Sequence, residues 1–312
     1  MFFLGLAAPL LFAGLGAQAP VPVILDTDIG DDIDDTWALA MLLGCPQTDL
    51  KLIVTSTNNT PGKARLVGKL LQYMGREDIP IGVGVKTSDK EFAQQKWLGE
   101  WNWENYQGVV HEDGVQALVD AINASPTPPV LMAIGPLTNL AAALQRDPSI
   151  ASKCRVVLMA GSIYKDYGGN EGRSAEWNVV CDTPASQAVF SAPWEISITP
   201  LDTCGQLRLA GEEYRQVVDS ACPRAKAVIE NYDLWAHRHH HPANSSSVLF
   251  DTVAAYMTFD ESLLNMETVK LIVDDGGFTV PDEEKGKPIR CALSWKDEAA
   301  FRRLLIESLT HK

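Results

Sequence analysis

The chain has 312 residues, 46% of them hydrophobic, so it is long enough to bury a substantial core in one large domain or two smaller ones. Its formal net charge is −14, and an acidic surface repels the phosphates of a nucleic-acid polymer. The composition therefore argues against a nucleic-acid partner and leaves the function otherwise open.

The first nineteen residues contain no charged side chain and end in the small-residue pattern Ala17-Gln18-Ala19. These features predict a secretory signal peptide over residues 1–19 and a secreted or periplasmic mature chain over residues 20–312. No basic residue precedes the apolar run, and the run is nearly long enough to span a bilayer, so an uncleaved anchor is the alternative. No later stretch of the sequence looks membrane-spanning.

Apolar strands and amphipathic helices alternate along the rest of the chain. The apolar run 21–25 predicts a first buried strand, and 37–43 predicts the helix after it. Further strands are expected at 50–55, 79–85, 129–134, 156–160 and 196–201. The intervening helices are expected at 63–74, 114–124, 137–145 and 183–191. This βαβα order predicts one α/β domain with a Rossmann-like, open, mainly parallel sheet and helices on both faces.

An unusually acidic segment joins the first predicted strand to the first predicted helix. Its six aspartates lie within ten residues and are Asp26, Asp28, Asp31, Asp32, Asp34 and Asp35. Neighbouring like charges repel one another, so we expect a cation to neutralise them. The segment follows the carboxyl end of a strand, where open α/β sheets bind ligands. An all-oxygen set of ligands suits a hard cation such as Ca²⁺ or Mg²⁺.

At five places the sequence resembles the inosine–uridine-preferring nucleoside hydrolase family. The similar segments are DTDIGDDIDDTWAL, the Asn-Asn-Thr turn after the second strand, IGPLTNL, NEGRSAEWN, and Phe-Asp followed by VAAY. In chain order they begin at Asp26, Asn58, Ile134, Asn170 and Phe250. The resemblance covers most of the mature chain. It implies the nucleoside hydrolase fold and that family's activity, the Ca²⁺-dependent hydrolysis of the N-glycosidic bond of ribonucleosides.

The resemblance also implies roles for individual residues. Asp28, Asp35 and Asp251 would be calcium ligands, together with the backbone carbonyl of Ile134. Asp26 would orient these ligands from behind them. The residues implied to bind the ribose are Asp34, Asn59, Asn170, Glu176 and Asn178.

The chemistry of N-glycoside cleavage calls for the same residue types. The transition state resembles an oxocarbenium ion, and carboxylates near C1′ stabilise its positive charge. A cation that chelates the 2′ and 3′ hydroxyls fixes the sugar ring and acidifies a bound water. We expect Asp28 to take the proton of that water as the general base. Amide and carboxylate side chains suit the recognition of hydroxyl groups.

Two departures from the family pattern leave alternatives open. The acidic segment holds two extra residues, so the family's aspartate pair matches either Asp34-Asp35 or Asp31-Asp32. The position of the following helix favours the first pair. Many family members also carry a histidine immediately before the last metal-binding aspartate. Phe250 stands there in this chain, and a phenyl ring cannot protonate the leaving base.

Either another group protonates the leaving base, or the base needs little help to leave. Other side chains could also stack on it. The candidates lie in two polar stretches, 96–108 and 236–247, that are expected to be loops or helix ends and not part of the core. They are His237, His239, His240, His241, Trp101 and Trp103. His111 is a further candidate proton donor. Alternatively, the histidines form an exposed helix end, and the tryptophans form a hydrophobic lid or an oligomer contact.

Two other functions compete with nucleoside hydrolysis. A secreted ribose- or nucleoside-binding protein on a decayed hydrolase scaffold would explain Phe250. A DxD Mg²⁺-dependent phosphatase would use Asp26 and Asp28, but it leaves the other motifs unexplained. The resemblance further implies a homodimer or homotetramer that acts on a small nucleoside or another N-riboside.

Overall fold

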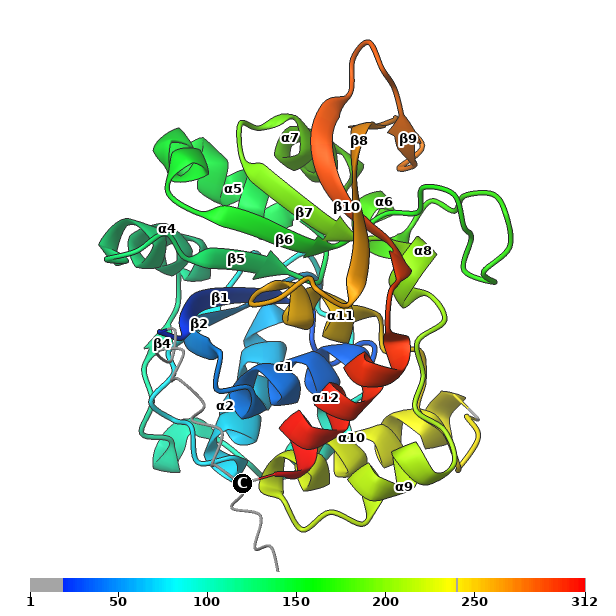
Figure 1. Cartoon of the computed structure of the whole chain (residues 1–312). Coiled ribbons are helices and arrows are strands. Elements are labelled where there is room, and N and C mark those ends of the chain that lie inside the picture. Colours follow the sequence, from blue (N-terminus) through cyan, green and yellow to red (C-terminus); the bar gives the residue numbers. More distant parts are fainter. Residues whose placement is uncertain (1–18, 240, 312) are drawn as a thin grey trace, which may run out of the picture.

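The computed structural model describes residues 19–239 and 241–311. All but the last residue of the predicted signal peptide lies outside these described residues, as does His240. The described part forms a ten-stranded sheet with helices against both faces (Figure 1), so the predicted fold class is confirmed. Within the described residues, no helix is both long and apolar enough to cross a membrane.

The strands form one sheet in the order β4-β3-β2-β1-β5-β6-β7-β10-β8-β9. Their bounds are β1 Val21–Thr27, β2 Thr48–Thr55, β3 Ile81–Val83, β4 Val110–His111, β5 Val130–Ala133, β6 Arg155–Met159, β7 Glu195–Thr199, β8 Leu264–Val273, β9 Thr279–Pro281 and β10 Lys287–Trp295. Neighbours from β4 to β10 are parallel, whereas β8 is antiparallel to both β10 and β9. The sheet is therefore mainly parallel with an antiparallel edge, a common arrangement in α/β proteins.

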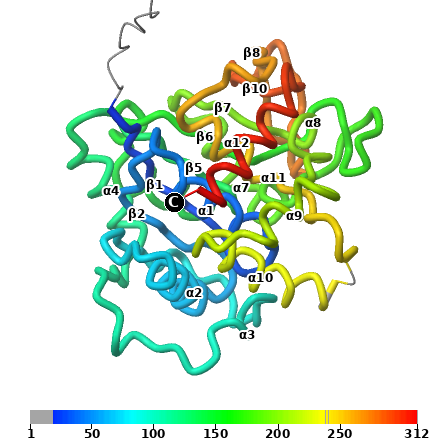
Figure 2. Tube along the Cα trace, turned by 60° about the horizontal axis from the view of Figure 1, so that its bottom comes forward, coloured from blue at the N-terminus to red at the C-terminus, as the bar shows by residue number. Residues whose placement is uncertain are grey.

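The helices fill the chain between the strands. Their bounds are α1 Asp34–Gly44, α2 Thr60–Tyr73, α3 Gln95–Leu98, η1 Trp103–Asn105, α4 Gly114–Ala124, α5 Thr138–Arg146, η2 Pro148–Ser152, α6 Trp177–Val180, α7 Thr183–Ser191, α8 Leu201–Cys204, α9 Glu212–Val218, α10 Pro223–His239, α11 Phe250–Met257 and α12 Glu298–Thr310. Although α2 and α10 are far apart in the sequence, α10 lies beside α2 and α3 (Figure 2).

The central strand β1 is buried on both faces, because its side chains alternate between two hydrophobic cores. Val23 and Leu25 belong to the core formed with α1, α2, α10, α11 and α12. Ile24 belongs to the core formed with α4, α5 and α7. Figure 1 shows α4, α5 and α7 on the other side of the sheet from α1, α2 and α12. An apolar run with no alternation in polarity is what this two-sided burial requires.

The acidic segment differs from the predicted loop at both of its ends. β1 continues to Thr27, because Asp26 stays in register with Val54 of β2 and Ala133 of β5. α1 begins at Asp34, three residues before the predicted apolar run, so Asp34 and Asp35 occupy its first turn. Negative charge is stabilised there by the helix dipole and by the free amides. The loop proper is therefore only residues 28–33.

Candidate active site

A cavity of about 340 Å³ opens at the carboxyl edge of the sheet, beyond β1, β5 and β6. Part of its wall is acidic and comes from the loop after β1 and from the first turns of α1 and α11. Another part is aromatic and comes from the loop before α6, from α6 itself, from α10 and from the start of α11. This is the edge at which open α/β sheets bind their ligands.

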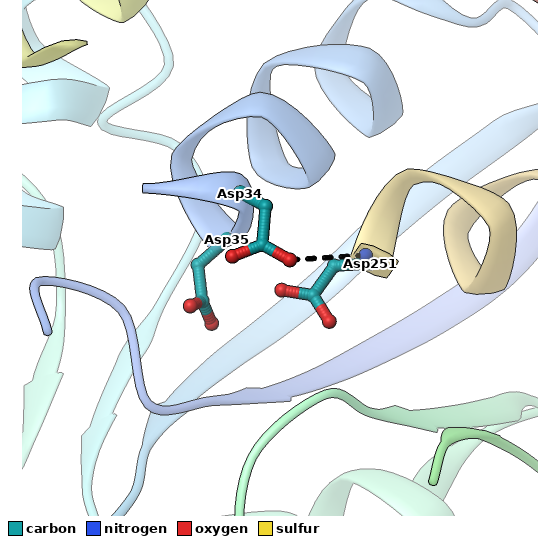
Figure 3. Close-up of side chains that lie close together, drawn as sticks. All are labelled: Asp34, Asp35 and Asp251. Carbon is teal, nitrogen blue, oxygen red and sulfur yellow. Dashed lines mark hydrogen bonds between the residues drawn. The ribbon is translucent and has the colours of Figure 1, made fainter. Parts of the chain in front are cut away.

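Three buried aspartates form the centre of the acidic wall. Asp34, Asp35 and Asp251 each offer a carboxylate oxygen, and these oxygens all lie within 4.8 Å of one another. The backbone amide of Asp251 donates a hydrogen bond of 3.3 Å to Oδ2 of Asp34, which joins the first turns of α11 and α1 (Figure 3). Among the described residues, no second group of three His, Cys, Asp or Glu side chains is arranged in this way.

The structure brings the predicted metal ligands to one cavity but groups them differently. Asp35 and Asp251 belong to the trio, whose third member is Asp34, the residue that the resemblance assigned to the sugar. Asp28 and Ile134 line the same cavity without belonging to the trio. The hydroxyl of Thr27, the last residue of β1, donates to Oδ1 of Asp35 and orients that carboxylate.

The alternative pair, Asp31 and Asp32, is held differently. Asp31 forms an ion pair of 2.8 Å with Lys63 and accepts a hydrogen bond from the amide of Asn58. Asp32 is exposed, and its Oδ1 accepts a hydrogen bond from the adjacent amide of Ile33. Both residues line the cavity, but neither belongs to the trio of carboxylates. The geometry therefore favours the alignment in which Asp34 and Asp35 match the aspartate pair of the family pattern.

Burial determines the charge of the acidic wall. Desolvation raises the pKa of Asp34, Asp35 and Asp251 well above the usual range, and repulsion from neighbouring carboxylates raises it further. Desolvation also raises the pKa of Asp28 to about 6, against the opposing positive charge of Lys63. A divalent cation would favour the charged forms of all these groups, and an all-oxygen donor set of this kind fits a hard cation.

Asp26 lies behind the cavity wall and is fully buried. Asn139, near the start of α5, donates to Oδ2 of Asp26 at 2.7 Å and to the carbonyl of Thr55 at 3.1 Å. Its own Oδ1 accepts the amide of Val85 at 2.8 Å. Burial raises the pKa of Asp26 to about 7, although the Asn139 hydrogen bond opposes the shift. This network ties together the ends of three parallel strands, β1, β2 and β3.

Glu176 and Asn178 also line the cavity, and the backbone holds both of them in place. The two carboxylate oxygens of Glu176 accept the amides of Asn178 at 2.9 Å and Gly161 at 3.0 Å. The side-chain amide of Asn178 donates to the carbonyls of Ile134 at 3.0 Å and Met159 at 3.1 Å. Burial raises the pKa of Glu176 to about 7, although the amide hydrogen bonds oppose it.

The other two asparagines that the resemblance assigned to the sugar do not line the cavity. The side chain of Asn59 caps α2 and accepts the amide of Gly62 at 3.1 Å. Its neighbour Asn58, whose φ is 55°, lines the cavity instead. Asn170 is exposed, and its side-chain amide contacts the carboxylate of Asp166. An asparagine before a helix is a preferred cap, and the motif alone does not distinguish the two adjacent asparagines.

The aromatic wall presents flat apolar faces. The aromatic and imidazole side chains in it are Tyr167, Trp177, Trp235, His239 and Phe250. His239 stacks on Trp235, with ring centroids 4.5 Å apart and planes inclined by 23°. Tyr167 packs edge-on against Phe250 at 6.2 Å. Such faces suit a planar heterocycle, and His239 adds a group that can transfer a proton.

The remaining candidate histidines lie elsewhere. His237 and His241 line a separate hollow of about 380 Å³ beside Tyr232. Nδ1 of His241 is 2.8 Å from the hydroxyl of Tyr232. His111 belongs to β4, is exposed and does not line the cavity. Among the described residues, His239 is therefore the one imidazole at the cavity.

The tryptophan-rich stretch packs against α2. Trp101 and Trp103 sit over Gly68, where an added Cβ would approach their rings to 2.7 and 2.6 Å. The indole of Trp101 donates to Gln72 at 2.8 Å. Neither ring lines the cavity, so the structure offers no base contact for them. Trp97 is buried, contrary to the expectation that this whole stretch lies outside the core.

Sequence reasoning overlooked several residues that shape the site. Lys63 is fully buried beneath the acidic loop. In the predicted helix 63–74 it lies on the same face as the apolar residues, and a lysine on that face was the feature of the sequence that could have revealed it. At Gly135, an added Cβ would approach Ser56 Oγ to 2.7 Å and Asp28 Oδ1 to 2.8 Å. The glycine of the IGPLTNL motif is thus explained by close packing against the acidic loop. No pattern in the sequence pointed to Trp235.

Comparison with known proteins assigns the chain to a family. The sequence profile of the "Inosine-uridine preferring nucleoside hydrolase" family matches residues 23–303. The chain belongs to this family. Two similar relatives are the non-specific ribonucleoside hydrolases RihC of Salmonella typhi and Salmonella newport, each 35% identical over 206 residues. Each match covers 62% of this chain and 64% of the relative, so the chain matches a little less than two thirds of their length.

Solved structures of the family share the fold. A plant nucleoside hydrolase, the PpNRh1 enzyme, superposes with a TM-score of 0.81 at 24% identity, covering 94% of this chain and all of that one. A purine-preferring ribonucleoside hydrolase from Gardnerella vaginalis superposes with a TM-score of 0.77 at 22% identity, covering 93% of this chain and 98% of that one. The mainly parallel ten-stranded sheet is therefore the nucleoside hydrolase fold.

Proposed function

We propose that the protein hydrolyses the N-glycosidic bond of ribonucleosides to ribose and free base, and that the reaction depends on Ca²⁺. The observation that carries the proposal is one cavity that combines the trio Asp34, Asp35 and Asp251 with Glu176 and Asn178. Family membership and the 35% identity with non-specific ribonucleoside hydrolases support it.

We assign calcium binding to Asp28, Asp35, Asp251 and the carbonyl of Ile134. That carbonyl accepts one hydrogen bond from Asn178 and keeps a second lone pair for a cation. Asp34 already uses Oδ2 for the amide of Asp251, so we assign its other oxygen to a ribose hydroxyl. A bound Ca²⁺ would neutralise the carboxylates, orient the sugar and lower the pKa of a nearby water.

Asp28 is the proposed general base. Burial raises its pKa to about 6, against the positive charge of Lys63, so near neutral pH it can take a proton from water. The water oxygen then bonds to C1′ while the C1′–N bond breaks and its electron pair leaves with the base. The neighbouring carboxylates stabilise the positive charge that develops on the sugar.

His239 is the proposed donor of the leaving-group proton. Phe250 cannot serve, and among the described residues His239 is the imidazole that lines the cavity. Its stacking on Trp235 fixes the ring beside a flat surface on which a base can lie. In its protonated form the ring would transfer a proton to a ring nitrogen of the base, which takes up the departing electron pair, and would itself be left as neutral imidazole.

The test is the release of free ribose from a panel of nucleosides by the purified protein, with Ca²⁺ and after chelation. We expect release that depends on Ca²⁺ and is lost in Asp28→Asn. Asp49→Asn provides the control, since it removes a half-buried carboxylate at the start of β2, far along the strand from the cavity. Nucleoside binding without turnover would instead support the alternative, a binding protein on a decayed scaffold, which Phe250 favours.

We also propose that the chain is exported after cleavage of residues 1–19. The support is the uncharged apolar run and its small-residue end. N-terminal sequencing of the protein recovered outside the cytoplasm should begin at Pro20. A full-length chain recovered in the membrane fraction would favour the anchor instead.

A further inference from the structure

Lys63 is a fully buried lysine whose ammonium contacts the acidic loop after β1. It lies near the start of α2, and its side chain is 0% exposed. Its ammonium donates to the carbonyl of Asp28 at 2.8 Å, to Oδ2 of Asp31 at 2.8 Å and to the carbonyl of Ser56 at 3.2 Å. An ammonium has three protons, so these three acceptors satisfy it completely.

The three acceptors come from two segments that must stay together for the cavity to form. Asp28 and Asp31 belong to the loop after β1, and Ser56 directly follows the parallel neighbour β2. Asn58 adds a second hydrogen bond to Oδ2 of Asp31 at 3.1 Å, so this carboxylate is held from two sides. Lys63 itself does not line the cavity and therefore cannot contact a nucleoside there.

Without such support, the acidic loop would tend to open. Its carboxylates are crowded at the cavity, and like charges at short range repel one another in a poorly solvated site. A buried ammonium is costly to desolvate and persists only when it is fully paired. Lys63 meets that condition because it binds the loop backbone itself as well as a side chain.

We propose that Lys63 is a positioning residue that holds the loop 28–33, and with it Asp28, in the geometry that binds calcium. The inference takes the Ca²⁺ ion from the proposed function, but it concerns only the affinity for that ion and not catalysis. Groups that orient metal ligands from behind typically account for 10- to 100-fold in affinity. Lys63 would act in this way through the carbonyl of Asp28 and through Asp31.

The direction in which Ca²⁺ affinity changes when Lys63 is removed distinguishes a positioning role from a purely electrostatic one. If Lys63 only added a positive charge near the site, its removal would tighten the binding of a cation, because repulsion would fall and Asp31 would be left unpaired. If Lys63 positions the loop, its removal weakens binding although the site becomes more negative. The two roles therefore predict changes in opposite directions.

The experiment is calorimetric titration of the metal-free full chain with Ca²⁺, for the wild type, Lys63→Met and Lys69→Met. Lys69 is the matched control, since it lies on the same helix and its ammonium also donates to backbone carbonyls, those of Trp97 and Leu98 in α3. We expect Lys63→Met to weaken Ca²⁺ binding roughly 10-fold and Lys69→Met to leave it unchanged. Turnover of Lys63→Met should recover at saturating Ca²⁺.

Unchanged or tighter Ca²⁺ binding by Lys63→Met would overturn the positioning role. If that variant does not fold, Lys63→Gln carries the same test, because it removes the charge but keeps one amide donor and should bind with intermediate affinity. A wild-type chain that binds no Ca²⁺ would overturn both this inference and the metal dependence of the proposed function. Normal wild-type binding with no weakening in the variants would overturn the Lys63 role alone.

Discussion

His237 and His239 are two residues apart at the end of α10, yet they border different hollows. His239 lines the cavity with the carboxylates, whereas His237 lines the hollow beside Tyr232. We therefore expect His239→Ala to lower kcat for nucleosides roughly 100-fold, the usual contribution of a general acid, and His237→Ala to leave it nearly unchanged. Steady-state ribose release measures both, and equal effects of the two substitutions would remove His239 from the mechanism.

Glu176 should give the metal-free protein a measurable pH dependence of stability. Burial raises its folded-state pKa from 4.5 to about 7, so its contribution is fully present below 4.5 and is lost as the pH rises through 7. Between pH 5 and pH 8 the loss is about 2 to 3 kcal/mol, at roughly 1.4 kcal/mol per pKa unit. The Glu176→Gln variant should therefore lose less stability than the wild type over this interval.

Urea unfolding at pH 5 and pH 8 in the presence of a chelator measures the difference. The change with pH is the readout, because the glutamine amide also disrupts one of the two backbone hydrogen bonds at every pH. Glu112→Gln is the control, since Glu112 is exposed. An identical pH dependence in Glu176→Gln and the wild type would contradict the raised pKa.

At the scale of the elements, N-caps explain where several helices begin. Asp182 caps α7 by accepting the amide of Ala185 at 3.1 Å, and it also accepts the hydroxyl of Thr138 on α5 at 2.5 Å. Asp297 caps α12 through the amide of Ala300 alone, at 2.8 Å. These caps are sequence signals, and the predicted helix 183–191 agrees with α7 at both ends.

The second hydrogen bond of Asp182 predicts unequal costs for two similar substitutions. Asp297→Ala should lower the free energy of unfolding by about 1 kcal/mol, the usual value of a cap. Asp182→Ala should lower it by about 2 kcal/mol, because it also leaves the Thr138 hydroxyl without its partner. Urea denaturation of both variants measures the difference. Equal losses would mean that the link between α5 and α7 contributes nothing.

Hydrophobic periodicity predicted the central parallel strands and several of the helices between them, but not the strands and helices that follow residue 201, and it predicted the site only partly. The helix 114–124 and the first buried strand follow from hydrophobic patterns that packing does not override. The choice between Asn58 and Asn59, and the packing of Trp101 over α2, depend on loop geometry that no local pattern encodes. Sequence patterns therefore predict which functional residues lie at the ends of strands more reliably than they predict which way the side chains of loop residues point.

At the scale of the whole molecule, calcium should stabilise the fold more strongly at high pH. Burial and repulsion from neighbouring carboxylates raise the pKa of Asp34, Asp35 and Asp251, so these groups must lose protons before a cation binds. At a hundredfold excess of Ca²⁺ over its Kd, the gain in unfolding free energy is about 2.7 kcal/mol. We expect this excess to raise Tm more at pH 8 than at pH 5.

Thermal unfolding with Ca²⁺, with Mg²⁺ and with a chelator provides the measurement. Mg²⁺ is the matched ion, since it demands a stricter octahedral geometry and should stabilise less. A larger gain at pH 5 than at pH 8 would contradict proton competition. The homodimer or homotetramer that the family resemblance implies stays a prediction, which light scattering of the same samples measures.

The hydrogen bond from the Asp251 amide to Asp34 joins residues 217 positions apart. During synthesis, the aspartates near the start of the chain leave the ribosome long before α11 exists to complete their cluster. Loop closure over such a distance is slow relative to local helix formation. Calcium binding should thus appear only in nascent chains long enough to have released α11, so it would report the completion of folding and not its beginning.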